Sequence, residues 1–291
     1  MSAFTGTLEQ TLTEATPLLL TALGENIVQK AGIVNVGLEG IMLCGALGAT
    51  LVTLSSGNPY LGVALAAIVG VAVAATFAGF AIKLAANQVV VGVVINLLAI
   101  GLTGTVYQAQ FGKTGALIST AQLPRLIWEQ TLMLPFVLLA VPLVWWWLNR
   151  TRRGLELRAC GEQPLAAEAA GIPVQRMRFF AVLFGGAMAG VGGAFLSVGG
   201  NNTFVPQMTD GRGFIALAIV TSGRWSPWGC LLAALIFGFA DALQYQGQSL
   251  GLHIPKDLLI GLPYAATLLI LLFGSRAGQA PAALGRPYRR A

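Results

Sequence analysis

The stretch YLGVALAAIVGVAVAATFAGFAIK, residues 60–83, carries no charged side chain before Lys83. A helix of about 20 apolar residues is long enough to cross the hydrocarbon core of a bilayer. Similar stretches recur at 13–28, 33–55, 88–111, 131–149, 178–199, 228–246 and 256–274. Of the 291 residues, 56% are hydrophobic and 10% are charged, whereas globular domains carry about a quarter charged residues. The sequence therefore predicts an all-α polytopic integral membrane protein.

The lysines and arginines predict how the chain is oriented. Of the 17 basic residues, six lie in the loop 150–178 and four in the tail 275–291. Because loops rich in Lys and Arg face the cytoplasm, we predict that this loop and this tail are both cytoplasmic. An even number of crossings must then separate them, so the short run GFIALAIVTS at 213–222 must also carry the chain across. This predicts about 8–9 membrane segments, with the N-terminus outside and the C-terminus, Lys30 and Lys83 inside.

The chain shows no arrangement typical of an enzyme or a nucleic-acid-binding protein. It has a single histidine, His253, and no zinc-ligand spacing, catalytic triad or paired carboxylates with a nearby base. The run FGKTG at 111–115 lacks the earlier glycine that a phosphate-binding loop requires. The basic residues lie at segment ends, which is typical of topology signals and not of a nucleic-acid surface. We expect Cys44, Cys160 and Cys230 to be buried free thiols, because no two are close in sequence.

Five polar residues within or beside the apolar stretches are candidates for a solute path: Asn35, Glu39, Asn96, Asp241 and Gln244. A polar or charged group at membrane depth normally faces a protein interior or a water-filled pathway. Each could instead form an interhelical hydrogen bond that only fixes packing. We favour the path for Glu39 and Asp241 and leave both alternatives open for Asn96. Asn35 and Glu39 would share one helix face if GIVNVGLEG (32–40) is helical.

Glycine is concentrated in the apolar stretches, as in CGALGA (44–49) and FGGAMAGVGGAF (184–195). Small residues let helix backbones approach closely in a membrane, where lipid supplies no hydrophobic drive for association. We therefore interpret these glycines as packing positions within a helical bundle.

The loop sequence RACGEQPLAAEAAGIPVQRMRF (158–179) predicts a short, bounded helix. Pro164 suits the first turn, Gly171 suits the C-terminal cap and Pro173 stops the helix, which gives about two turns over 164–170. Two turns are not stable alone in water, so this helix needs a partner surface. A linker helix resting on lipid headgroups is the alternative, but such helices carry a large apolar face with Trp, Phe or Leu. The alanines favour a helix that docks in a groove of another protein.

This loop resembles the cytoplasmic coupling-helix region of ABC importer permeases of the sugar, branched-chain amino acid and nucleoside group. Three further stretches look like the nucleoside-type branch of that family: LLLTALGENIVQKAGIVNVGLEGIMLCGALGA (18–49), ANQVVVGVVINLLAIGLT (86–103) and DGRGFIALAIVTSGRWSPWGCLLAALIFGFADALQ (210–244). The phrase NVGLEG separates this branch from the ribose permeases.

The resemblance implies a type II ABC importer transmembrane domain, with residues 1–291 as one transmembrane permease domain in the cytoplasmic (inner) membrane. It implies three protein partners: a cytoplasmic ABC ATPase, a second permease subunit that is identical or not, and an extracytoplasmic lipoprotein receptor. ATP and Mg²⁺ would bind the ATPase, so we expect no cofactor in this chain, and membrane lipid would surround it. The residues that fall on the family's coupling pattern are Gly161, Glu162, Pro164, Ala167, Glu168, Ala170 and Gly171.

The favoured function is that of a permease subunit for nucleosides, a transport component and not an enzyme. A simple-sugar (ribose-like) ABC permease is the first alternative. An ion-coupled secondary transporter is the second, and it would need inverted repeats and midplane ion ligands instead of a docking helix. A membrane scaffold is the third, and it leaves the charges of Glu39 and Asp241 unexplained.

Overall fold

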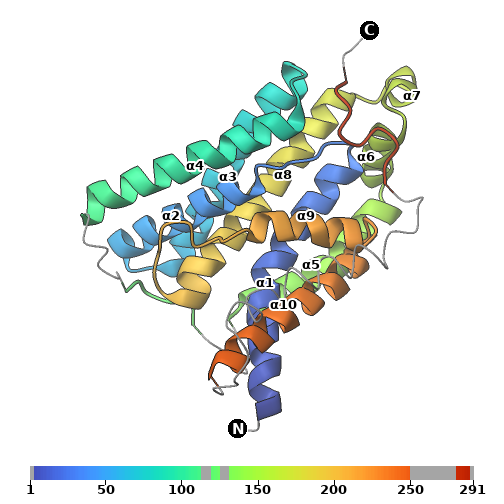
Figure 1. Cartoon of the computed structure of the whole chain (residues 1–291). Helices are drawn as coiled ribbons and strands as arrows, with labels where there is room; N and C mark the ends of the chain where they lie inside the picture. Colours follow the sequence, from blue (N-terminus) through green and yellow to red (C-terminus); the bar gives the residue numbers. More distant parts are fainter. Residues whose placement is uncertain (1–2, 113–118, 125–130, 250–279, 289–291) are drawn as a thin grey trace.

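The computed structural model describes residues 3–112, 119–124, 131–249 and 280–288. The described residues form helices joined by short connections (Figure 1). In chain order the helices are α1 (Ala3–Lys30), α2 (Leu38–Ser56), α3 (Pro59–Ala78), α4 (Gln88–Phe111), α5 (Met133–Arg150), α6 (Arg152–Glu162), α7 (Pro164–Ala169), α8 (Val174–Ala194), α9 (Arg212–Ser222) and α10 (Pro227–Ser249). π-helical turns extend α3 over Gly79–Lys83 and α8 over Phe195–Asn201.

Six helices in the described part of the chain are long and apolar enough to cross a membrane. They are Leu38–Ser56, Pro59–Lys83, Gln88–Phe111, Met133–Arg150, Val174–Asn201 and Pro227–Gln244. Each corresponds to a predicted stretch, which confirms a polytopic helical membrane protein. The first predicted stretch, 13–28, lies inside the longer and more polar α1, and the last, 256–274, lies outside the described residues.

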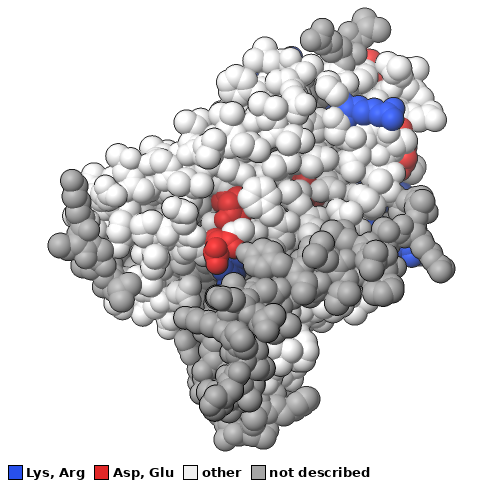
Figure 2. Space-filling model, in the orientation of Figure 1, with Lys and Arg blue, Asp and Glu red and all other residues white. Residues whose placement is uncertain are grey.

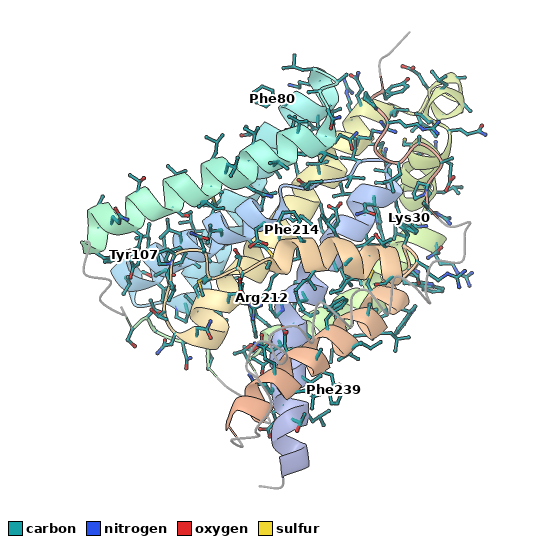
Figure 3. All side chains as sticks on the ribbon, in the orientation of Figure 1. Lys30, Phe80, Tyr107, Arg212, Phe214 and Phe239 are labelled. Carbon is teal, nitrogen blue, oxygen red and sulfur yellow. The ribbon has the colours of Figure 1, made fainter. Side chains whose placement is uncertain are left out.

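The outer surface of the bundle is largely uncharged, as lipid contact requires. One face of α4 exposes a continuous set of aliphatic side chains, namely Val89, Val90, Val93, Val94, Leu97, Leu98 and Leu102. Phe80, Phe214 and Phe239 project from three other parts of the bundle and are each about half exposed (Figure 3). In water such a surface would be unfavourable, because burial of apolar area drives folding.

Glycine brings the central helices into close contact. α8 runs through the middle of the bundle and packs against α1, α2 and α3 (Figure 1). A β-carbon on Gly45 of α2 would lie 2.5 Å from the carbonyl oxygen of Gly190 in α8, and one on Gly70 of α3 would meet the backbone of Gly186. The predicted packing role of these glycines is confirmed.

The basic segment ends gather at one end of the bundle. Lys83 Nζ lies 5.8 Å from the ring centre of Phe179, at the start of α8. The backbone N–H of Gly285 donates to the carbonyl oxygen of Gly32 just after Lys30. The loop 150–178 and the described part of the tail therefore lie at the same end as Lys30 and Lys83.

The chain between α1 and α2 is not helical, so the stretch predicted at 33–55 becomes helical only at Leu38. Residues 33–35 have no regular secondary structure, and α2 begins only at Leu38. Gly32 takes a positive φ of 90°, which favours glycine, and starts this break. Asn35 and Glu39 therefore do not share a helix face, because only Glu39 is in a helix.

All three cysteines are buried free thiols, as expected. Burial raises the pKa of the Cys160 thiol to about 11. This thiol therefore stays protonated and unreactive near neutral pH.

We expect Gly45→Val to destabilise the bundle by about 1–3 kcal/mol, because the larger side chain overpacks the contact between α2 and α8. Gly101→Val is the matched control, since Gly101 is exposed on α4 and a β-carbon there would have no neighbour within 4 Å. The free energy of unfolding of the purified protein in detergent measures both. Equal losses in the two variants would contradict this packing role.

Candidate functional site

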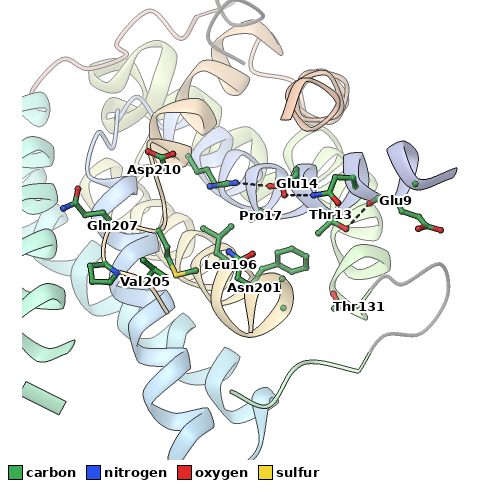
Figure 4. A pocket seen from close by; sticks show the side chains of 18 residues that line it. Glu9, Thr13, Glu14, Pro17, Thr131, Leu196, Asn201, Val205, Gln207 and Asp210 are labelled. Atoms are coloured by element: carbon green, nitrogen blue, oxygen red, sulfur yellow. Dashed lines mark hydrogen bonds and ion pairs between the residues drawn. The ribbon is translucent and has the colours of Figure 1, made fainter. Parts of the chain in front are cut away.

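A polar cavity of about 830 Å³ lies between the first half of α1 and the segment from Phe195 to Arg212 (Figure 4). α1 supplies Glu9, Gln10, Thr13 and Glu14, and the other wall supplies Asn201, Gln207, Asp210 and Arg212. Phe195, Leu196 and Met208 add an apolar part. The cavity is large enough for a small solute, since ligand sites commonly measure about 300–1,000 Å³.

Helical spacing places the α1 residues on one side of the helix. Glu9, Thr13 and Pro17 follow one another four residues apart, as do Gln10 and Glu14. Thr13 Oγ1 donates to the backbone carbonyl of Glu9 at 3.0 Å, and Gln10 Nε2 donates to Glu14 Oε1 at 3.3 Å. The start of α1 is thus ordered as a polar wall of the cavity.

An ion pair joins the two walls. Arg212 Nη2 donates to Glu14 Oε2 at 3.0 Å, and both side chains are mostly buried (14% and 13% exposed). Figure 2 shows acidic side chains gathered near the start of α9 on a face that is otherwise largely uncharged. A carboxylate, a guanidinium and amides together can donate to and accept from the hydroxyl groups of a polar solute.

The start of α9 is held by Glu39. Its Oε1 accepts from the backbone N–H of Gly211 at 2.9 Å and its Oε2 from that of Gly213 at 2.7 Å. Glu39 also lies in the first turn of α2. A negative charge is favourable at a helix N-terminus, and this carboxylate lies at two of them.

Asn96 and Asn35 connect the start of α2 to its neighbours. Asn96 Oδ1 accepts from the N–H of Gly40 at 2.8 Å, and its Nδ2 donates to the carbonyl of Val36 at 3.0 Å. Asn35 Oδ1 accepts from the N–H of Gly37 at 3.0 Å. The side-chain oxygens of Asn96 and Asn35 and the amide nitrogen of Asn96 therefore all take part in interhelical or local hydrogen bonds.

The structure separates the five predicted path residues from the cavity. Asn35, Glu39 and Asn96 gather at the start of α2, while Asp241 and Gln244 lie on α10. Asp241 is buried and within electrostatic reach of Arg212, and Gln244 is half-buried. None of the five lines the cavity.

Two polar groups escaped sequence reasoning. The first is the cavity wall on α1, whose four-residue spacing from Glu9 to Pro17 was the available signal. The second is a buried chain of hydrogen bonds: Glu25 Oε1 accepts from Gln29 Nε2 at 3.0 Å, and Gln29 Oε1 accepts from Trp225 Nε1 at 2.7 Å. Glu25 and Gln29 are four residues apart in α1, but nothing in the sequence connects them to Trp225.

The predicted short helix is present as α7, Pro164–Ala169. Gly171 takes a positive φ of 81°, and its N–H donates to the carbonyl of Glu168 at 2.8 Å, as expected of a C-terminal cap. Ala170 lies between the last residue of α7, Ala169, and the capping residue Gly171. Ala167 is the buried residue of α7. Gly161 and Glu162 end the preceding helix α6, which the sequence did not predict.

Helices that begin inside an apolar bundle, next to a polar cavity, are typical of membrane transport proteins. The chain belongs to the family described as the branched-chain amino acid transport system / permease component, which matches residues 7–273. It is thus a multi-pass membrane permease, a transport component and not an enzyme.

Three relatives are similar to almost the whole chain. The putative glucose ABC transporter permease protein TsgC13 of Haloferax volcanii is 41% identical over 92% of this chain and 87% of its own length. The guanosine ABC transporter permease protein NupQ of Bacillus subtilis is 35% identical over 96% and 94%. The nucleoside ABC transporter permease protein NupC of Lactococcus lactis is 33% identical over 94% and 93%.

A second permease from each of two of these organisms is also similar to this chain. NupP of Bacillus subtilis, a guanosine ABC transporter permease protein, is 29% identical over 79% of this chain and 71% of its own length. NupB of Lactococcus lactis, a nucleoside ABC transporter permease protein, is 28% identical over 78% of this chain.

We expect Glu39→Gln to destabilise the protein by about 1–3 kcal/mol, because the amide offers only one acceptor oxygen and one buried N–H of α9 loses its partner. Glu156→Gln is the control. Among the described residues Glu156 pairs with Arg152 and Arg153, whose side chains are 91% and 70% exposed, and such exposed pairs contribute little. Thermal unfolding in detergent measures both variants. A Glu39→Gln protein as stable as the control would contradict the anchoring role.

Proposed function

We propose that this protein is a permease subunit of an ABC importer that moves nucleosides across the cytoplasmic membrane. The observation that carries the proposal is the polar cavity between α1 and the segment 195–212, with its Glu14–Arg212 pair. The guanosine and nucleoside permeases that resemble this chain over nearly its whole length support the choice of solute.

The lining suits an uncharged solute with a sugar and a flat ring. Carboxylates and amides such as Glu14, Asp210 and Asn201 can accept from ribose hydroxyls, and Arg212 can donate. Val205, Pro206 and Met208, which are exposed or half-buried, offer an apolar surface against which a nucleobase can pack. We propose that these residues, and not the five expected from the sequence, contact the solute.

A simple sugar is the alternative, favoured by the 41% identity to a putative glucose permease. A sugar would use the hydroxyl-binding groups of the cavity and leave the apolar surface of Val205, Pro206 and Met208 without a base. The two alternatives therefore predict different effects of the nucleobase: it strengthens binding to a nucleoside permease and does not strengthen binding to a sugar permease.

The arrangement of the two ends supports the proposed orientation. The cavity lies along the first half of α1. The basic loop 150–178, which contains α6 and α7, and the C-terminal tail lie at the other end of α1, beyond Lys30. We propose that the N-terminus is outside, the C-terminus is inside and the chain crosses about 8–9 times. α9 with its non-helical lead-in would supply the crossing expected at 213–222.

Three partners follow from this proposal. A cytoplasmic ABC ATPase binds ATP and Mg²⁺ and docks on the coupling residues from Gly161 to Gly171, and a solute-binding lipoprotein delivers solute at the cavity end. A second permease completes the path. The similarity of this chain to two differently named permeases in one organism supports a second subunit that is not identical.

We expect the complete transporter in proteoliposomes to take up labelled guanosine in an ATP-dependent manner. Excess unlabelled nucleoside should suppress this uptake, and equal glucose or ribose should not. The control is the same complex with an ATPase subunit that cannot hydrolyse ATP. Suppression by glucose alone would favour the sugar permease, and uptake without ATP hydrolysis would contradict an ABC importer.

We expect Gly171→Val to lower uptake while membrane insertion is unchanged. A side chain in the left-handed region costs about 1–2 kcal/mol, which would displace the end of α7, although no neighbouring atom blocks the site. Gly171→Asn is the matched control, because asparagine tolerates this conformation better. Uptake per ATP hydrolysed measures the effect, and equal values for both variants would argue against α7 as the coupling element.

A further inference from the structure

The C-terminal segment 280–288 lies against α6 and α7 (red in Figure 1). The backbone N–H of Ala283 donates to the carbonyl of Gly161 at 2.9 Å, and that of Ala282 donates to Glu162 Oε2 at 3.2 Å. The hydroxyl of Tyr288 donates to a carboxylate oxygen of Glu168 in α7. This segment is therefore hydrogen-bonded to three of the predicted coupling residues.

A buried arginine ties the same segment to the end of α1. Arg178 is only 1% exposed. The sequence by itself indicated only that Arg178 is one of the basic residues of the loop 150–178 that orient the chain in the membrane. Its Nε donates to the carbonyl of Ala31 at 2.9 Å, its Nη2 to that of Cys160 at 3.1 Å and its Nη1 to that of Arg286 at 3.5 Å. One guanidinium thus joins the end of α1, the end of α6 and the C-terminal segment.

Apolar contacts strengthen this junction. Tyr288 is 8% exposed and packs with Cys160, Ala167 and Val174 in one buried cluster. Its ring centre lies 5.6 Å from Arg178 Cζ, a distance typical of a cation–π contact. Displacing α7 would therefore disturb the segment and Arg178 together.

α1 connects this junction to the cavity. Its 28 residues span about 42 Å at 1.5 Å per residue. Ala31 and Gly32, which bind Arg178 and Gly285, follow its last residue, and Glu9 to Glu14 line the cavity near its first. A displacement at one end of this helix can reach the other end.

We propose that residues 280–288 are part of the coupling element: they fasten α7 to α1, and Tyr288 and Arg178 are positioning residues that deliver movement of α7 to the cavity. The inference rests on the proposed function, because it takes the ATPase as the partner that moves α7. A groove of about 590 Å³ between α7 and the segment, lined in part by Leu165, Arg286 and Pro287, continues the surface on which that ATPase docks.

The test compares Tyr288→Phe with Tyr60→Phe in the complete transporter in proteoliposomes. Tyr288→Phe removes only the hydroxyl that donates to Glu168, and Tyr60 is an exposed tyrosine at the start of α3. Because hydrogen bonds to charged groups contribute about 1.5–3 kcal/mol, we expect uptake per ATP hydrolysed to fall about tenfold or more in Tyr288→Phe only. An unchanged ratio would overturn the inference.

The ratio of uptake to ATP hydrolysis separates coupling from stability. A variant that is only less stable loses uptake and ATP hydrolysis together, so its uptake per ATP hydrolysed is unchanged. Parallel losses of uptake and ATP hydrolysis in Tyr288→Phe would therefore make residues 280–288 a purely structural segment and overturn the inference.

The two proposals fail differently. An unaltered transporter that imports no nucleoside would contradict the proposed function. An unaltered transporter that imports nucleoside, with the same uptake per ATP in Tyr288→Phe, would contradict only the coupling role of residues 280–288.

Discussion

The carboxylate of Glu39, bound by the backbone N–H groups of Gly211 and Gly213, is the interaction on which the middle of the structure depends. In an apolar bundle no water is available to satisfy the first N–H groups of a helix. α2 and α9 both begin after non-helical backbone. Glu39 accepts from the N–H groups at the start of α9, and Asn96 accepts from the N–H of Gly40 in the first turn of α2. With α9 held in this way, Arg212 can reach Glu14 and close one side of the polar cavity.

Close packing makes the rest of the bundle possible. Gly45, Gly70, Gly186 and Gly190 let α2, α3 and α8 approach until backbone meets backbone. α1 then lies along this group, with the cavity at one end and the Arg178 junction at the other. On the proposed function, solute binding and ATPase docking are separate sites joined by one long helix.

Sequence reasoning succeeded where a local pattern decides the structure. Apolar length identified the spans, and Pro164 with Gly171 bounded α7, because proline and glycine act on their own backbone. It placed the start of the 33–55 stretch too early, because Gly32 breaks the helix before α2 begins at Leu38. The cavity wall on α1 was missed because the four-residue spacing from Glu9 to Pro17 does not show what that side of the helix faces. Arg212, the partner of Glu14, lies 198 residues away in the sequence.

By itself the sequence determined a helical membrane protein, the positions of its spans and the short helix α7. A span is one continuous run of about 20 apolar residues, and proline and glycine act on the helical turn in which they lie. Only the tertiary structure decided the roles of the polar residues. Asn96 and Glu39 hold the starts of α2 and α9 by hydrogen bonds. Arg178 is buried where three segments meet, and the first half of α1 forms a wall of the cavity. The reason is physical: a buried polar group must find a partner, and which partner it finds depends on helices distant in sequence that packing brings together.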